Sequence, residues 1–244
     1  MIFTVVLITL LIQWFVNLEG RYRYNGWFSA YYFWINKTVK VPFPWLNVAI
    51  WILPFIILAV LLHGMFHHFW GIAGQFIFNL LLLWYCTDYD GAKDRAKKDN
   101  DMGSFFTFTF ERVFAMIFWY AFLGVMGLTL YYMVCVVRNT LEQLNEHNQG
   151  SWQVVNQLRG ILDWVPLRIV GLTFALVGRF STTFAAVFKA TFTGVGETRK
   201  QVVEWAELAL EEGHSLAAAL ALVDRTLLVW LVALALLSVG AWVG

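Results

Sequence analysis

The sequence predicts an all-α integral membrane protein: a polytopic bundle of five to six apolar helices that forms a single domain over residues 1–244. Of the 244 residues, 60% are hydrophobic and only 14% are charged, whereas about 25% are charged in soluble domains. The apolar residues gather in long runs, with most charges between them. This composition excludes a disordered tail and an ordinary soluble enzyme, and a net charge of +1 offers no basic field for a nucleic acid. Membrane lipids are the expected surroundings.

Six apolar runs are the candidate membrane segments, and a spanning helix needs about 20 residues. They cover residues 2–16, 45–62, 69–86, 113–137, 164–178 and 226–243. The first run lacks a basic leader and a small-residue cleavage site, so we expect a retained span and not a signal peptide. Together, residues 1–86 should form the N-terminal spans. The fifth run is short and contains Pro166 and Arg168, so it is the weakest candidate.

The linkers predict the orientation. Four basic residues lie between the first and second runs and four between the third and fourth, but none between the second and third. These basic residues are Arg21, Arg23, Lys37 and Lys40, and then Lys93, Arg95, Lys97 and Lys98. Because positive charge stays on the cytoplasmic side, both basic linkers should be cytoplasmic and the N-terminus outside.

The fourth run, residues 113–137, has two alternative arrangements. It can span the membrane, which the basic residues of the following linkers mildly favour. It can instead bend at Gly124 and Gly127 and return to the side it entered, because two arms of about 12 residues reach only some 18 Å each. We expect Leu at either glycine to damage folding more than Leu at Gly178.

An amphipathic helix is predicted over residues 197–212, outside the membrane. Its polar face is acidic, with Glu204 and Glu207 among its members, so anionic lipid should not attract it. Docking on the protein's own cytoplasmic side, or on a partner, is the expected role. Gly213 is a plausible C-terminal cap.

Metal and cofactor signals are weak. His63 and His67 have the i, i+4 spacing of a metal pair, but no acid or cysteine stands near to complete a ligand shell, and a turn between two runs explains them better. The two cysteines, Cys86 and Cys135, have no partner at disulfide or metal spacing and should be buried free thiols. No nucleotide-binding loop and no hydrolase motif occur, so no cofactor is predicted.

Charged and polar residues at the ends of the fourth and fifth runs form the most informative pattern. They are Glu111, Arg112, Arg138, Asn139, Asp163 and Arg168, with Arg159 close by. Charges at such positions normally face the bundle interior and are paired. Surplus guanidinium groups would suit a carboxylate or phosphate ligand, while the alternative is a set of ion pairs that fix the helix register. We expect Glu111 to pair with Arg168 and Arg112 with Asp163, which requires the re-entrant arrangement.

The same residues carry a family resemblance. The run ILDWVPLRIVGLTFALVGRF (residues 161–180) and the run ERVFAMIFWYAFLG (residues 111–124) resemble the AmpE membrane proteins. The likeness covers about residues 111–243, and it extends to the related cobalamin-biosynthesis proteins CobD and CbiB.

The resemblance implies a multi-pass protein of the bacterial inner membrane with a signalling role in envelope stress and β-lactamase induction. Likeness to CobD and CbiB implies an alternative, a membrane-embedded ligase or transferase that acts on a carboxylate or phosphate. A structural subunit of a complex with other inner-membrane proteins is a third possibility.

Overall fold

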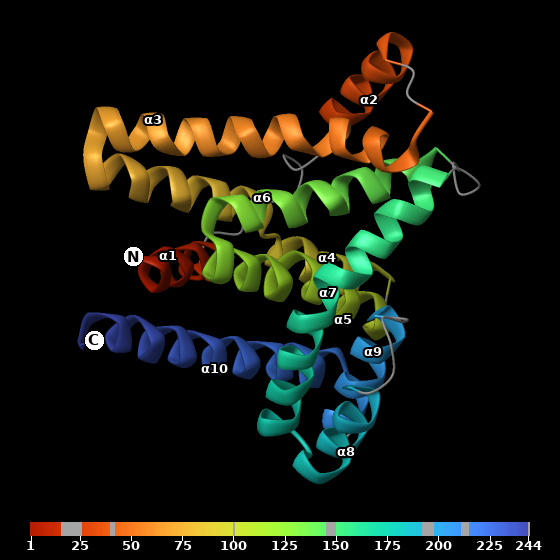
Figure 1. Ribbon diagram of the computed structural model, residues 1–244. Coiled ribbons are helices and arrows are strands. Elements are labelled where there is room, and N and C mark those ends of the chain that lie inside the picture. Colours follow the sequence, from red (N-terminus) through yellow and green to blue (C-terminus); the bar gives the residue numbers. More distant parts are fainter. Residues whose placement is uncertain are drawn as a thin grey trace.

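The computed structural model describes residues 1–15, 26–39, 42–99, 101–144, 150–191, 198–210 and 215–243. Within these ranges the chain is all-helical and has no strand, which confirms the predicted class (Figure 1). The helices are α1 (Ile2–Phe15), α2 (Gly26–Thr38), α3 (Pro44–Cys86), α4 (Tyr89–Asp99), α5 (Met102–Thr109), the π-helix η2 (Phe110–Phe114), α6 (Ala115–Gln143), α7 (Gly150–Val177), α8 (Phe180–Thr191), α9 (Thr198–Ala209) and α10 (Leu216–Val243).

Four helical stretches of the described chain are long and apolar enough to cross a membrane. They are Pro44–Asp94, Met102–Gln143, Gly150–Val177 and Leu216–Gly240, while α1 is a shorter apolar helix. Each predicted run falls in one of these helices. The fifth run, the weakest candidate in the sequence, is the second half of α7. This helix begins at Gly150, 14 residues before the run does.

The second and third runs are two arms of α3, which doubles back at Gly71 (Figure 1). Gly71 has φ 59° and ψ −143°, a conformation that essentially only glycine adopts. The arms touch across the reversal: the side-chain nitrogens of Gln75 and His63 are 3.1 Å apart, and the rings of Phe66 and Phe78 are 5.4 Å apart. The turn was expected at the histidine cluster, but it lies after the cluster, at Gly71. His63 is part of the helix.

The fourth run reverses in the same way, at Gly124, with φ 63° and ψ −143°. The run therefore bends and turns back at Gly124, and a straight helix over residues 113–137 is excluded. Gly127 lies one turn past the reversal, where a Cβ atom would meet the carbonyl oxygen of Trp119 on the first arm. Both arms of α6 consequently end on the same side of the molecule (Figure 1).

Two opposite ends of the bundle follow from these reversals. The N-terminus of α1, the tip of α3 and the C-terminus of α10 lie at one end, and α4, α5 and α9 lie toward the other (Figure 1). The charge pattern of the linkers predicts the same grouping, with the N-terminus at one end and the basic linker that contains α4 at the other. Arg21, Arg23 and Lys40 lie outside the described residues, as do Glu197, Glu211, Glu212 and the expected cap Gly213.

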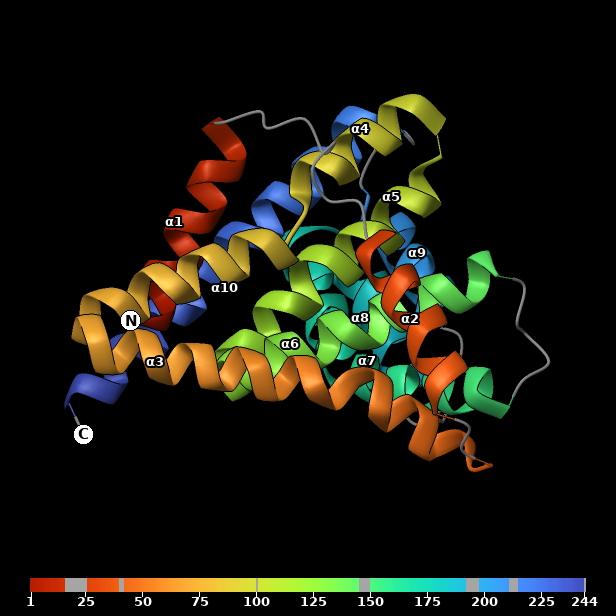
Figure 2. The same cartoon turned by 90° about the horizontal axis from the view of Figure 1, so that it is seen from above.

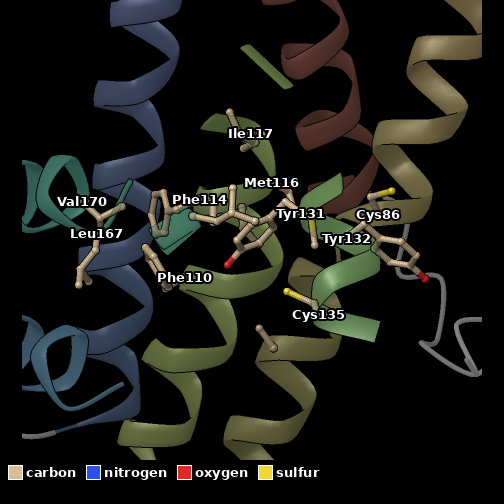
Figure 3. Packing of buried hydrophobic residues seen from close by; sticks show 14 of the residues in the cluster. Cys86, Phe110, Phe114, Met116, Ile117, Tyr131, Tyr132, Cys135, Leu167 and Val170 are labelled. Atoms are coloured by element: carbon tan, nitrogen blue, oxygen red, sulfur yellow. The ribbon is translucent and has the colours of Figure 1, made fainter. Parts of the chain in front are cut away.

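The core surrounds the α6 hairpin, which packs between α3 and α7 (Figure 2). Aromatic residues dominate it: the ring of Phe114 lies 6.2 Å from that of Phe174 on α7 and 5.4 Å from that of Trp230 on α10. Figure 3 shows Cys86 and Cys135 within this cluster, and both are buried free thiols, as predicted. In a membrane, such packing stabilises the bundle through close van der Waals contact between the helices.

Candidate functional site: a buried charge network beneath a polar cavity

Arg159 on α7 is the centre of a buried charge network. Its guanidinium forms an ion pair with Glu111 of η2, and its Nε lies 3.3 Å from an oxygen of Asp163. Exposed fractions are 6% for Arg159, 7% for Glu111 and 1% for Asp163. Tyr131, on the second arm of α6, donates a hydrogen bond of 2.7 Å to Asp163. Charges buried so deeply persist only when each is compensated, and here two carboxylates share one guanidinium.

Local structure brings these groups together. Arg159 and Asp163 are four residues apart on α7, so they lie on one face of that helix. Glu111 is part of a five-residue π-helix, an irregularity that often accompanies functional positions. Since α6 reverses at Gly124, Tyr131 returns to the depth at which α7 passes the hairpin.

A second basic residue reaches Glu111 from α9. Arg199 places its Nε 3.6 Å from the same Glu111 oxygen that Arg159 contacts, but the Arg199 side chain is half exposed. Glu111 is thus held by one buried and one exposed guanidinium. The amphipathic segment does dock on the protein's own surface, with Val202, Trp205 and Ala206 buried.

A polar cavity of about 720 Å³ opens above the network. Its wall is formed by α5, η2, the end of α6 and α9. The charged and amide side chains that line it are Asp101, Glu111, Arg112, Asn139, Arg199, Lys200, Glu204 and Glu207. Three predicted site residues, Glu111, Arg112 and Asn139, therefore meet at one opening.

Asp101 at the rim of this cavity begins α5. Its carboxylate accepts hydrogen bonds from the backbone N–H groups of Gly103 and Ser104, at 3.0 and 3.2 Å, and from the Ser104 hydroxyl. The hydroxyl bond is the main cause that lowers the pKa of Asp101, and the backbone bonds add to it. The carboxylate is therefore a structural cap of α5.

Arg138 lies beside the network and not in the cavity wall. Its Nε donates to Asn156 on α7 at 3.1 Å, and its Nη1 lies 3.8 Å from Glu142. The guanidinium also lies 5.7 Å from the Trp152 ring centre. Arg138 thereby joins the end of α6 to the start of α7.

The expected cross-pairing is wrong. Arg168 donates to the carbonyl oxygens of Trp164 (2.8 Å) and Ala190 (3.3 Å) and covers the Trp164 ring at 4.0 Å, so it ties α7 to the end of α8. Arg112 lies 5.6 Å from the Tyr132 ring centre and does not pair with Asp163. Arg159 takes both roles, and its spacing from Asp163 was the signal in the sequence. Arg199 gave no such signal, because only the fold brings α9 to η2.

The histidine pair lies far from this network, at the tip of α3 (Figure 1). His63 contacts Gln75, and the ring of Phe78 lies 6.0 Å away. Among the residues that the structure describes, no three histidine, cysteine or acidic side chains gather in a way that could hold a metal ion. His147 and His214 lie outside those residues.

Comparison with known proteins places this region in a family. The family model "Regulatory signalling modulator protein AmpE" matches residues 87–243. The match adds residues 87–110, which include α4 and α5, to the 111–243 stretch expected from the sequence. No curated protein and no solved structure matches the chain. The relation to CobD and CbiB stays a prediction. With nearly two thirds of its length matched, and with apolar helices long enough to span a membrane, the chain belongs to the AmpE family.

Proposed function

We propose that this AmpE-family protein is a signalling protein of the bacterial inner membrane whose polar cavity binds an anionic ligand, a carboxylate or a phosphate. Its role in envelope stress and β-lactamase induction follows from the family resemblance. The observation that carries the ligand proposal is the cavity wall, where Arg112, Arg199, Lys200 and Asn139 lie around one opening. Of the four acidic side chains in the same wall, Asp101 caps α5 and Glu111 pairs with Arg159, so Glu204 and Glu207 oppose three basic groups. Guanidinium groups suit such anions because they offer paired N–H donors.

Arg199 offers a way to turn binding into a signal. Its guanidinium contacts Glu111 and also lines the cavity. Of the two arginines that contact Glu111, Arg159 is buried and Arg199 is half exposed. An anion in the cavity competes with Glu111 for Arg199, while Arg159 keeps Glu111 compensated. Binding would thereby change the contact of α9 with η2 without exposing a buried charge. A ligand shifts such an equilibrium only through different affinities for its two states.

Thermal unfolding of the purified protein in mild detergent tests the ligand class. We expect citrate and inorganic phosphate to raise the melting temperature, and uncharged glycerol at the same concentration to leave it unchanged. Arg199→Gln should reduce the shift severalfold, because one charge-assisted hydrogen bond contributes about 1.5–3 kcal/mol. Lys37→Gln on α2 removes the same charge far from the cavity and should preserve the shift. No shift with either anion, or an equal loss in both variants, would contradict the proposal.

An enzymatic role, ligase or transferase, remains the alternative, and the acids in the same wall favour it. Glu204 and Glu207 lie with Lys200 around the opening, an arrangement that can hold a metal–nucleotide complex or an amine. Stabilisation by magnesium–ATP that exceeds the effect of phosphate would favour this reading. Co-purification of stoichiometric inner-membrane proteins would instead favour a structural subunit.

A further inference from the structure

A second cavity, of about 660 Å³, lies where the end of α7 and the turn before α8 meet the end of α9 and the first turns of α10. Its lining includes none of the residues of the first cavity. Most of it is small or apolar, including Val177, Ala221 and Leu222. The charged side chains in this lining are two arginines, Arg179 and Arg225. Both are exposed, and neither forms an ion pair with the residues that the structure describes.

The position of Arg179 is fixed by the turn between α7 and α8. Its backbone N–H donates to the carbonyl oxygen of Ala209 at the end of α9, at 3.2 Å. The preceding residue, Gly178, lies so close to α9 that a Cβ atom would collide with the same carbonyl group. The backbone of Arg179 is therefore held at the cavity, and its side chain is part of the lining.

Arg225 belongs to a candidate membrane span, Leu216–Gly240. It lies on the outer side of α10, and Leu228 and Val232 follow it on the same face, 51% and 60% exposed. An arginine that faces lipid is costly unless it reaches a headgroup or an anion. The face of α10 thus presents a positive charge with an apolar track beneath it.

Helix α8 adds an aromatic face beside the cavity. Phe180, Phe184 and Phe188 recur every four residues and are 53%, 38% and 57% exposed. Their rings stack in sequence, with centres 5.2 and 6.1 Å apart. The neighbouring face, which turns toward the bundle, carries Thr183 and Val187, both buried. A helix with an exposed aromatic stripe at the edge of the bundle is typical of the membrane interface (Figure 1).

We propose that the cavity binds the phosphate of an anionic phospholipid between Arg179 and Arg225, with the acyl chains along α10 and the phenylalanine stripe of α8. The charge of the two guanidinium groups complements the phosphodiester, and each offers paired donors to its oxygens. Basic pockets between membrane helices bind anionic headgroups in this way. Apolar surface on both sides of the arginines suits a lipid and not a free anion.

Native mass spectrometry of the full chain in mild detergent tests this site. Titration with phosphatidylglycerol should give a saturable one-lipid adduct, and phosphatidylcholine should bind much more weakly. Arg179→Gln and Arg225→Gln should each weaken the adduct about fivefold, since a basic residue at an anionic headgroup contributes about 1 kcal/mol. Lys37→Gln should bind as the unchanged protein does. Equal melting temperatures without lipid establish that the variants are folded.

Four results would overturn the proposal. Equal binding of the two lipids would show that the protein does not recognise the charge of the headgroup. Adducts unchanged in both arginine variants would place the lipid elsewhere. Release of the lipid by millimolar glycerol phosphate, or a dimer in place of the adduct, would assign the cavity to a free phosphate or to a second copy of the chain. Because Arg199 and the other residues that line the first cavity take no part, failure here leaves the anion cavity unaffected.

Discussion

At the scale of single residues, Arg159 is the position on which most of the buried charge depends. Among the described residues it alone forms ion pairs with both Glu111 and Asp163. Of the partners that the structure describes, Arg159→Gln leaves the exposed Arg199 to one carboxylate and the Tyr131 hydroxyl to the other. Removal of one partner from a buried ion pair costs about 3–5 kcal/mol. We expect thermal or denaturant unfolding in detergent to show a loss of this size.

Two control variants separate the charge effect from packing. Arg112→Gln also removes an arginine beside η2, but one that contacts aromatic rings, so its loss should be much smaller. Arg159→Met combined with Glu111→Gln and Asp163→Asn removes all three charges and should recover much of the stability. Equal losses for Arg159→Gln and Arg112→Gln would show that the network is not a stabilising unit.

Asp101 contributes to stability in a way that depends on pH. Its lowered pKa means that its contribution to stability is complete above the ordinary carboxyl pKa of about 3.9 and is lost as the pH falls through the lower folded value. Asp101→Ala should cost about 0.5–2 kcal/mol at pH 7, the usual value of an N-cap. The difference in unfolding free energy should shrink below pH of about 4. Asp101→Asn keeps a cap without a charge, and a pH-independent gap between Asp101→Ala and the unchanged protein would contradict this account.

At the scale of elements, the two helix reversals depend on glycine backbones. A Cβ atom would have open space at Gly124 and at Gly71, so only conformational strain opposes alanine there. For such φ and ψ values the strain is about 1–3 kcal/mol. We expect Gly124→Ala and Gly71→Ala to lower the unfolding free energy by that amount.

Gly64 is the matched control for these reversals. It also has open space around a built Cβ atom, but it lies in regular helix on α3. Gly64→Ala should therefore be neutral or stabilise the protein by up to about 1 kcal/mol. A stability loss at Gly64 equal to that at Gly124 would remove the argument from backbone strain.

The glycines also show how far the sequence predicts this fold. Gly124 and Gly127 inside an apolar run indicated a bend, and the bend is there. Gly178 was expected to tolerate Leu better than either, but its close approach to Ala209 on α9 contradicts that ranking, since α9 lies far along the chain. The turn between the two arms of α3 was expected at the histidines, and it lies a few residues later, at Gly71. Contacts between distant segments, and not local patterns, decide these cases.

The charged residues follow the same rule. The pairing of Arg159 with Asp163 could be predicted from their spacing along one helix, and the burial of Glu111 from its place before an apolar run. Which arginine meets Glu111 depends on how α7 crosses the hairpin, and nothing in the local sequence encodes that crossing. Arg168 has two backbone carbonyl partners, and such partners leave no trace in a pattern of opposite charges.

At the scale of the whole molecule, the reversal of α6 determines which surfaces share one side of the membrane. Helix α5, which carries Ser104, and the end of α6, which carries Glu142, lie at the same end of the bundle, and the tip of α3 lies at the other (Figure 1). His67 is four residues before the reversal that forms this tip. All three side chains are exposed. The basic linkers predict that the Ser104 end is cytoplasmic.

Cysteine labelling in cells tests both the orientation and the reversal. On a background with Cys86→Ala and Cys135→Ala, an impermeant thiol reagent should label His67→Cys in intact cells. Ser104→Cys and Glu142→Cys should react only after permeabilisation. A straight α6 would instead expose Glu142→Cys together with His67→Cys, and labelling of Ser104→Cys from outside would invert the orientation. The positions test the two predictions separately. If Ser104→Cys and Glu142→Cys are both labelled from outside and His67→Cys is not, the reversal holds and the orientation is inverted. The anion cavity would in that case face the periplasm.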